Sequence, residues 1–476
     1  MLHIHFVGIG GAGMSGLAEI ALARGNKVSG SDIQDSAKLR ELKKLGAEIH
    51  IGHRKNNISQ KIDLVVFTSA VKSSNNPELE EAERLNIRSV RRAEFLGELT
   101  SGMQTIAVAG THGKTTTTSM IAHIMLEAGL DPMVSVGASV FELGGKNAHS
   151  GNGSLAVVEA DEYDRSFLSL KPFIAVVTTL EAEHLDIYSD LTDIQNAFVE
   201  FVCNGSEQTG MAVVNIDEPA IRAILSRFNK RIVTFGIRSD EAKYRAIDIE
   251  LDGLHSFSTI TRGTEPIGSL ELAIPGEYNI MNALAAIATA ECMAIPFEIA
   301  ASALATFQGA ERRAQVIGEV NGALVIDDYA HHPTEIEATL TALKNGYPGR
   351  RILAAFQPHT FSRTRDFAKD FGAVFARLAD AVYLTEVYPA REQPIEGVTS
   401  KLIFNAMKTE GLKNIRLVAE LNELPKMIAG DVIKGDIVIT FGAGSITEQA
   451  PKILLAIRQR SNGSKTLKHK PNKVTA

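Results

Sequence analysis

Cysteine is scarce in this sequence, and long uncharged apolar runs are missing. Among 476 residues there are two cysteines, Cys203 and Cys292, and both stand alone without metal-ligand spacing. Two lone cysteines do not indicate a disulfide framework or a zinc site, and they fit a reducing cytoplasm. No uncharged apolar run approaches the length of a membrane span, and no basic-then-apolar leader opens the chain. These absences predict a cytoplasmic protein without a membrane segment.

The chain also lacks an excess of basic residues. It has 49 Lys and Arg against 56 Asp and Glu, for a formal net charge of -7, which argues against nucleic acid as the main partner. The one basic block follows Ile457 and contains no acid, with Ser, Asn, Gly and Pro interleaved. We therefore interpret residues 459–476 as a disordered basic tail rather than a binding arm.

The length of the chain predicts about three domains, because a single core rarely serves so many residues. Three segments each begin with an apolar strand followed by a Gly-rich or His-rich turn and a helix, which is typical of parallel α/β sheets. Restarts of this pattern predict domains at 1–102, 103–312 and 313–458. The alternating stretch 244–274 predicts antiparallel strands in a side sheet.

A nucleotide phosphate loop is the most informative motif. An apolar strand at 105–109 enters a turn that ends in Gly113, Lys114 and Thr115, and a helical run follows to residue 127. Such a turn aims backbone N–H groups at phosphate oxygens, while the lysine reaches the outer phosphates and the threonine can bind Mg²⁺. The motif predicts ATP or GTP, with Lys114 in a solvated loop. It departs from strict P-loop spacing, since Gly110 stands only three residues before Gly113, so a chance Gly-Lys-Thr is the alternative.

A second glycine loop lies near the amino terminus. Residues 8–13 satisfy the dinucleotide fingerprint, and Asp32 follows Gly13 by 19 residues at the end of a second strand. Taken alone, the pattern predicts an NAD site. Its physical content is only that glycines let a diphosphate approach a helix start, so a nucleotide-sugar diphosphate fits as well. A tight structural turn is the third interpretation.

Two polar residues follow apolar strands of the middle segment. Glu159 comes directly after the strand 155–158, and His184 follows the strand 174–179. Because residues beyond the carboxyl ends of parallel strands face one crevice, we expect both side chains to bind Mg²⁺ beside Thr115. The alternatives are an acid that merely caps a strand end and a histidine in a solvated turn.

Polar clusters also follow two strands of the last third. Residues 327–335 are rich in Asp and His, and His359 and Arg363 follow the next strand. Such clusters suit a small zwitterion, whose carboxylate meets Arg363 or a histidine. The alternative for Asp327 and Asp328 is the N-cap region of a helix over 333–343. Residues 442–445 are interpreted as a tight turn.

Together these segments resemble the Mur ligase family, the ATP-dependent amide-forming enzymes of peptidoglycan synthesis. The similarity covers the chain up to the tail and depends on six motifs in the family's order. They are residues 5–16, 110–115, 159–162, 183–186, 278–283 and 328–335. The resemblance implies an α/β protein with a Rossmann-like UDP-sugar domain, a central P-loop-type ATPase domain and a Rossmann-like C-terminal domain that binds the amino acid.

The activity implied is ligation of L-alanine to the carboxylate of UDP-N-acetylmuramate through an acyl phosphate, with ATP and Mg²⁺, by a cytoplasmic monomer or homodimer. A recycling ligase of the same family, which adds a whole tripeptide, is the close alternative. An NAD-dependent oxidoreductase leaves Lys114 and Thr115 without purpose. A mechanical or regulatory ATPase leaves the first glycine loop unexplained.

The resemblance also implies roles for individual residues. ATP is assigned to Gly110, Thr111, His112, Gly113, Lys114, Thr115, Thr116, Asn279, Arg312, Arg313 and Asp328. The UDP-sugar is assigned to Gly8, Gly10, Gly11, Gly13, Asp32 and Ser69. Mg²⁺ is assigned to Thr115, Glu159 and His184, and catalysis to Lys114, His331, His359 and Arg363. Several sister ligases carry a carbamylated lysine after the segment equivalent to 183–186, whereas here no lysine occurs between Lys171 and Lys230.

Overall fold

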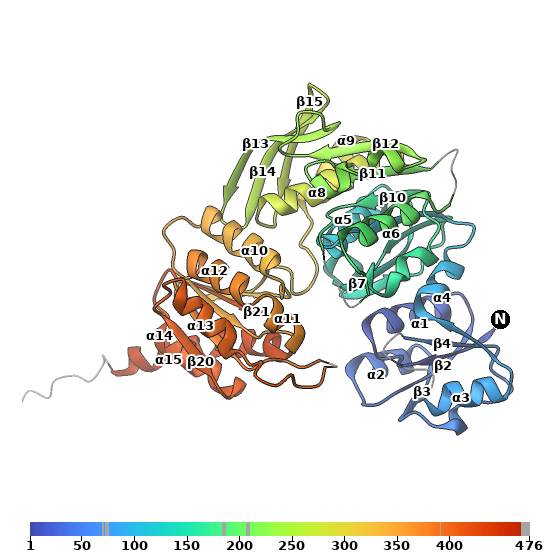
Figure 1. The fold of residues 1–476 in the computed structure, drawn as a ribbon, viewed down its shortest axis with the longest axis horizontal. Coiled ribbons are helices and arrows are strands. Elements are labelled where there is room, and N and C mark those ends of the chain that lie inside the picture. The colour runs from blue at the N-terminus through green and yellow to red at the C-terminus, as the bar shows by residue number, and fades with distance from the viewer. Residues whose placement is uncertain (69–70, 72–75, 183–186, 206–209, 391, 468–476) are drawn as a thin grey trace, which may run out of the picture. The chain divides into compact units, whose positions relative to one another are not determined.

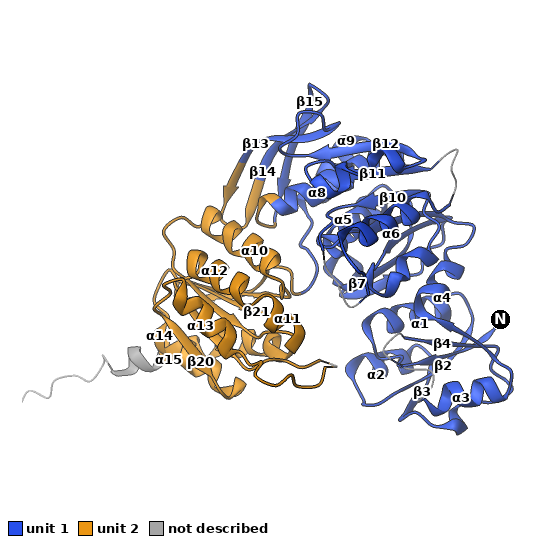
Figure 2. Cartoon of the chain, viewed as in Figure 1, with its two compact units in different colours: residues 1–249, 257–273, 278–311 blue, residues 250–256, 274–277, 312–476 orange. Residues whose placement is uncertain are grey.

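The computed structural model describes the chain except for residues 69–70, 72–75, 183–186, 206–209, 391 and 468–476 (Figure 1). The described residues form two compact units (Figure 2). Unit 1 comprises residues 1–249, 257–273 and 278–311, and unit 2 comprises residues 250–256, 274–277 and 312–476. Over the described ranges, no helix has both the length and the apolar character needed to cross a membrane.

The first sheet of unit 1 is parallel and has the strand order β3-β2-β1-β4-β5. Its elements are β1 (His3–Val7), α1 (Ala12–Ala23), β2 (Lys27–Asp32), α2 (Ala37–Lys44), β3 (Glu48–Ile51), β4 (Leu64–Phe67), α3 (Pro77–Arg84), β5 (Arg88–Arg91) and α4 (Arg92–Leu99). The chain order reverses at β1 and β4, and ligands of doubly wound sheets bind beyond the carboxyl ends of strands at such a point. The glycine loop 8–13 follows β1 there.

The central sheet has ten strands in the order β15-β14-β13-β12-β11-β10-β6-β9-β7-β8. Its strands are β6 (Gln104–Ala109), β7 (Met133–Val140), β8 (Lys146–His149), β9 (Leu155–Glu159), β10 (Ile174–Val177), β11 (Met211–Asn215), β12 (Arg231–Gly236), β13 (Tyr244–Asp252), β14 (His255–Arg262) and β15 (Glu265–Leu272). Its helices are α5 (Lys114–Glu127), α6 (Leu191–Cys203), α7 (Pro219–Arg222), α8 (Glu277–Cys292) and α9 (Phe297–Ala305). β9, β6, β10, β11 and β12 are mutually parallel and form the buried centre.

The separate side sheet expected at 244–274 is not what forms. β13, β14 and β15 extend the central sheet, because β13 pairs parallel to β12 through Phe235 with Tyr244 and Gly236 with Arg245. The first two sheets also share one apolar core, which includes Phe6 and Leu17 beside Met133 and Ala148. They therefore belong to one compact unit, although they occupy two of the three predicted segments.

Unit 2 is built on a six-stranded sheet in the order β16-β17-β21-β18-β19-β20, in which only β16 is antiparallel. Its strands are β16 (Gln315–Val320), β17 (Ala323–Asp328), β18 (Ile352–Phe356), β19 (Ala381–Thr385), β20 (Ile415–Val418) and β21 (Ile437–Phe441). Its helices are α10 (Pro333–Gly346), α11 (Phe361–Asp366), α12 (Ala368–Leu378), α13 (Lys401–Thr409), α14 (Leu424–Asp431) and α15 (Gln449–Leu467). Two apolar cores, one including Phe356 and one including Tyr383, cover the sheet.

The basic segment predicted to begin at residue 459 starts inside α15, which continues to Leu467. Arg and Gln are good helix formers, and Arg460 donates from its guanidinium to the carbonyl oxygens of Ala429 and Val432. Contacts with α14 therefore extend the helix into the basic segment. Residues 468–476 lie outside the described residues.

Candidate active site

The phosphate loop between β6 and α5 is fastened to the end of β10. Thr111 N–H donates to the Thr179 carbonyl at 3.1 Å, and His112 N–H donates to Thr179 Oγ1 at 2.7 Å. In return, the Thr178 hydroxyl donates to the His112 carbonyl at 2.6 Å. A Cβ on Gly110 would lie 2.1 Å from Thr178 Oγ1, so this close approach requires glycine. The loop is therefore shaped before any nucleotide binds.

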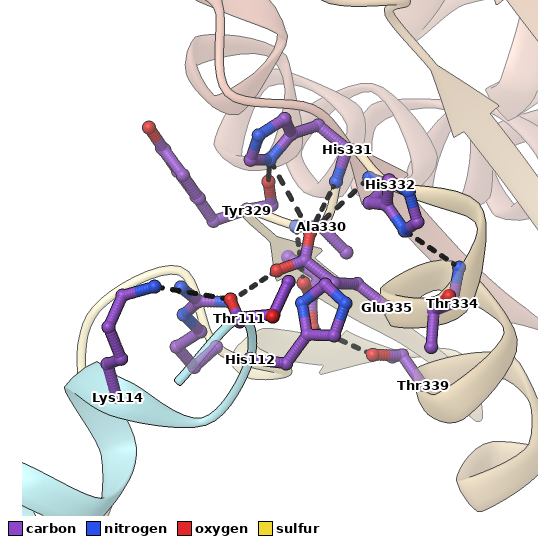
Figure 3. A network of polar contacts seen from close by, with 12 residues as sticks. Thr111, His112, Lys114, Tyr329, Ala330, His331, His332, Thr334, Glu335 and Thr339 are labelled. Carbon is purple, nitrogen blue, oxygen red and sulfur yellow. Dashed lines mark hydrogen bonds and ion pairs between the residues drawn. The ribbon is translucent and has the colours of Figure 1, made fainter. Parts of the chain in front are cut away.

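Lys114 is paired rather than solvated, which corrects the sequence expectation. Its Nζ lies 2.8 Å from Glu162 Oε2, and it donates to the carbonyls of Gly110 and Thr111 at 2.6 and 3.2 Å. Figure 3 shows the bond to Thr111. The side chains of Lys114 and Glu162 are only 15% and 4% exposed. Burial opposes the lysine charge, but the carboxylates of Glu162 and Asp161 outweigh it and raise the pKa of Lys114.

Asn279 is linked to the first turn of α5 through Asn282, a residue not predicted for the site. The Asn282 amide donates to Asn279 Oδ1 at 3.3 Å, and Asn282 Oδ1 accepts from the Thr117 hydroxyl at 3.2 Å. A Cβ on Gly113 would lie 2.5 Å from Asn282 Oδ1. With φ at 82°, Gly113 also adopts the left-handed backbone that glycine favours. Helix α8 thus buttresses the turn that presents Lys114 and Thr115.

The predicted Mg²⁺ ligands follow neighbouring strands. Glu159 ends β9, where it is in register with Val108 of β6, and Thr115 lies in the first turn of the helix that follows β6. Gly137 N–H donates to Glu159 Oε2 at 2.8 Å and fixes the carboxylate. A carboxylate and a hydroxyl are the hard oxygen donors that Mg²⁺ prefers, so this pair fits that ion. His184, the third predicted ligand, lies outside the described residues.

The amino-terminal glycine loop is closed by its own backbone and by one acid. Gly8 and Ile9 donate from their N–H groups to the Ser31 carbonyl at 2.8 and 3.0 Å. Asp32 Oδ2 accepts from Gly10 N–H at 2.8 Å, so this carboxylate holds the loop. Gly11 caps α1 in extended conformation, which leaves the first turn of that helix facing the loop. Ser69, also predicted for this site, lies outside the described residues.

A buried acid beneath this loop escaped the sequence analysis. Glu78 of α3 accepts hydrogen bonds from the Ser31 hydroxyl at 2.5 Å and the Asn57 amide at 2.5 Å, and its Oε2 lies 3.1 Å from His53 Nδ1. Although burial opposes ionisation, the nearby His5 ring and the hydrogen bonds from Ser31 and Asn57 lower the pKa of Glu78 to about 2. The cluster therefore holds Ser31, whose carbonyl shapes the glycine loop.

In unit 2, Asp327 and Asp328 end β17 rather than capping a helix. Asp328 Oδ1 accepts from Ala330 N–H at 2.7 Å, and Oδ2 accepts from Ala314 N–H at 2.8 Å. Burial raises the pKa of Asp328 to about 6. The N-cap of α10 is His332, whose ring accepts from Thr334 N–H at 3.4 Å, so the N-cap interpretation of Asp327 and Asp328 is wrong.

Imidazoles gather at the carboxyl edge of this sheet. His331 and His359 meet edge to face, with ring centroids 5.3 Å apart, and His359 stacks on Tyr388 at 5.8 Å. Burial, with Arg363 nearby, lowers the pKa of His331 to about 3 and that of His359 to about 4. Glu335 accepts from the N–H groups of His331 and His332 at 3.1 and 3.3 Å, as Figure 3 shows. With these lowered pKa values, the His331 and His359 rings are neutral at physiological pH.

The two arginines at the start of unit 2 both lie over the Tyr329 ring. Arg312 lies 4.7 Å over the Tyr329 ring and donates to the Gly442 carbonyl at 2.5 Å. Arg313 lies 3.6 Å from a Glu335 carboxylate oxygen and 5.4 Å from the Tyr329 ring. Both guanidiniums are therefore candidates to meet an added anion.

Three family models match successive parts of the chain. They are described as Mur ligase family, catalytic domain, over residues 3–104, Mur ligase middle domain over residues 108–290, and Mur ligase, glutamate ligase domain, over residues 312–444. These segments correspond to the three sheets.

Curated relatives and solved structures agree with these matches. UDP-N-acetylmuramate--L-alanine ligase of Salinibacter ruber is 45% identical, over 93% of this chain and 92% of that protein. The enzyme of the same name from Geobacter sulfurreducens is also 45% identical, over 96% of this chain and 98% of its own length. The crystal structure of the UDP-N-acetylmuramate-alanine ligase of Thermotoga maritima has a TM-score of 0.82 at 30% identity and covers 98% of this chain and 100% of its own. A murein peptide ligase of Psychrobacter arcticus has a TM-score of 0.70 at 26% identity, with coverage of 96% and 99%.

Proposed function

The chain belongs to the Mur ligase family, and from this premise we propose that it joins L-alanine to the lactyl carboxylate of UDP-N-acetylmuramate with hydrolysis of ATP. The observation that carries the proposal is the pair of phosphate-type loops in unit 1. One loop presents Lys114 at a helix start, and the other offers Gly8 to Gly13 to a diphosphate. A ligase that brings ATP to a nucleotide sugar needs both.

The proposed chemistry has two steps. A carboxylate oxygen of the sugar substrate attacks the γ-phosphorus of ATP, and ADP leaves with the electron pair of the broken bond. The amine of alanine, after loss of its ammonium proton, attacks the acyl carbon, and phosphate leaves from the tetrahedral intermediate with the proton that the nitrogen gives up. The first step brings two anions together, so preorganised positive groups lower its barrier.

Lys114 supplies the fixed positive charge for this step. Its Nζ is already held at the phosphate loop by Glu162 and two carbonyls, so binding of ATP substitutes phosphate oxygens for some of these partners. The N–H groups of the loop and the start of α5 add further donors. Asn279 beside Asn282, and Arg312 and Arg313 in unit 2, are proposed to contact the nucleotide.

Mg²⁺ is proposed to bind through Thr115 and Glu159, whose oxygens are the donors it prefers. When bound, the ion neutralises phosphate charge as the γ-phosphoryl group leaves. Glu159 holds its own orientation through Gly137 whether or not the ion is present.

The amine site is proposed in unit 2, at His331, His359 and Arg363. A guanidinium binds the carboxylate of an amino acid through paired hydrogen bonds. Because burial keeps His331 and His359 neutral, their imidazoles can form hydrogen bonds with the amino acid, but with pKa values of about 3 and 4 they are weak acceptors for its ammonium proton.

The use of ATP and a nucleotide sugar agrees with a cytoplasmic location. For the oligomeric state, a monomer or a homodimer is still predicted.

A recycling ligase is the second candidate, favoured by the likeness to the Psychrobacter murein peptide ligase structure. Phosphate release, measured with UDP-N-acetylmuramate and either L-alanine or a tripeptide, separates the two. We expect release with L-alanine and little with the tripeptide. Rapid ATP hydrolysis without any UDP-sugar would contradict both ligase proposals.

A further inference from the structure

One arginine lies against the glycine loop of unit 1. Arg92 is the first residue of α4, and its side chain packs on Gly13 in the first turn of α1. A Cβ added to Gly13 would lie 3.1 Å from both Cδ and Nη1 of Arg92. The guanidinium is therefore in contact with the helix start that the glycine loop exposes.

The ion pair that Arg92 makes is loose. Its Nη2 lies 4.0 Å from Asp161 Oδ2, and the two side chains are 29% and 44% exposed. The adjacent Arg91 makes a closer pair, with Nη1 2.8 Å from Asp164 Oδ2. Arg92 and Asp161 also line a cavity of about 120 Å³, so the guanidinium has open space on one side. A weak partner and free space allow Arg92 to turn to another anion.

The glycine loop needs a cation that it does not contain. Residues 8–13 are Gly, Ile, Gly, Gly, Ala and Gly, so the loop has no charged side chain of its own. The charged side chain hydrogen-bonded to the loop is Asp32, which is an anion. A helix amino terminus supplies about half a positive charge. A diphosphate bears about two negative charges and is bound best by a planar guanidinium with paired donors. Arg92 is the guanidinium that lies at the right place.

We propose that Arg92 binds the diphosphate of the UDP-sugar, exchanging Asp161 for phosphate oxygens at the start of α1. The inference rests on the proposed function, because it takes its ligand from there. The sugar's carboxylate is a second anion that the same guanidinium could meet. The contact with Gly13, where the diphosphate is expected, assigns Arg92 to the diphosphate.

The test is calorimetric binding to the full-length chain of UDP-N-acetylmuramate, UDP and ATP. Arg92→Ala should weaken UDP-N-acetylmuramate and UDP by the same factor, roughly tenfold to a hundredfold, and leave ATP affinity unchanged. The affinity of Arg92→Lys for both UDP ligands should lie between those of wild type and Arg92→Ala, since lysine keeps the positive charge but lacks the paired donors of the guanidinium. Arg88→Ala is the matched control, because Arg88 of β5 is an exposed arginine paired with Glu98.

Each outcome decides the matter. UDP affinity within twofold of wild type in Arg92→Ala would overturn the proposal, and so would a loss limited to UDP-N-acetylmuramate, which would assign Arg92 to the carboxylate. Wild-type protein that binds UDP-N-acetylmuramate and not UDP would overturn it as well. If Arg92→Ala does not fold, Arg92→Lys decides by the same comparison. Wild-type protein that binds no UDP-sugar would instead contradict the proposed function.

Discussion

Gly10 and Asp32 are matched to each other across the amino-terminal loop. Gly10 N–H donates to Asp32 Oδ2 at 2.8 Å, and a Cβ on Gly10 would lie 2.8 Å from that same oxygen. The position of Asp32 therefore leaves no room for a side chain at residue 10, independently of any phosphate that approaches the loop. In a dinucleotide site the acid at the end of the second strand binds a ribose hydroxyl. Here Asp32 Oδ2 already holds the loop.

Replacing Gly10 should separate the two phosphate-type loops functionally. In Gly10→Val the branched side chain would displace Asp32 and distort the loop, so we expect UDP-N-acetylmuramate affinity to fall at least tenfold. ATP affinity should stay near normal, because its loop follows a strand of a different sheet. Calorimetry with both ligands measures the difference. Gly430→Ala is the control, since nothing lies within 4 Å of a Cβ there. Equal loss of both ligands would show instead that the variant misfolds.

Removing Lys114 should cost stability as well as turnover. Lys114→Ala leaves the nearly buried Glu162 carboxylate without its ion partner, which destabilises by about 3 kcal/mol. Lys114→Ala/Glu162→Gln should recover most of the thermal midpoint but no phosphate release, since the phosphate-binding charge is still missing. Lys146→Ala, which breaks a more exposed pair with Glu19, should change the midpoint little. Turnover in the double variant would exclude Lys114 from the chemistry.

Glu78 makes the amino-terminal sheet sensitive to acid. Its pKa is about 2 in the folded chain against 4.5 in an ordinary environment, so the ionised form stabilises the fold above pH 4.5. That stabilisation, on the order of 3 kcal/mol, is lost as the pH falls from about 4.5 towards 2. Glu78→Gln should therefore lower the calorimetric unfolding midpoint at pH 7, and its deficit should shrink at pH 4.

Glu80→Gln is the matched control for this experiment, because Glu80 is on the same helix and makes an exposed pair with Lys55. It should leave the midpoint nearly unchanged at both pH values. A Glu78→Gln deficit that stays constant between pH 7 and pH 4 would mean that the cluster stabilises by packing and not by charge.

The sequence predicts what is local and misses what the fold brings together. β9 covers the predicted strand 155–158 and includes one further residue, Glu159, because the segment is a short apolar run bounded by polar residues. Glu78 and Arg92 escaped notice because their partners, Ser31 and Gly13, are distant in sequence and meet only through the sheet. Composition likewise does not show that Ala429 of α14 offers its carbonyl to Arg460 in the predicted tail.

His359 should affect the amino acid and not the nucleotide. Its Nδ1 is buried and has no hydrogen-bond partner among the described residues, which suits a group that a substrate completes. We expect His359→Gln to raise KM for L-alanine tenfold or more while KM for ATP changes little. With a pKa of about 4, the ring stays neutral from pH 6 to 9 and should add no ionisation to kcat/KM there. His255→Gln, at the exposed first position of β14, is the control, and an unchanged KM for L-alanine in His359→Gln would place the amine site elsewhere.

Activity should not depend on carbon dioxide. A lysine carbamate needs a neutral amine near the metal. Among the described lysines, Lys230 is a candidate, because burial lowers its pKa to about 8 and so favours the neutral amine. Its Nζ donates to the carbonyls of Pro172 and Asn204 at 2.6 and 3.2 Å. β12 runs parallel to β6 through β11 and β10. Lys230 directly precedes β12, so it lies at the amino-terminal ends of these strands, whereas the phosphate loop lies at their carboxyl ends. A carbamate there cannot serve Glu159 and Thr115.

Phosphate release should therefore proceed at the same rate in buffer stripped of carbon dioxide and in buffer with added bicarbonate at equal pH and ionic strength. Lys230→Met should respond like wild type to both, apart from any loss of stability. A rate that falls on stripping and returns with bicarbonate would mean that a carbamylated lysine acts in the reaction. If that response survived in Lys230→Met, the lysine would lie elsewhere in the chain, and the proposed Mg²⁺ site of Thr115 and Glu159 would be incomplete.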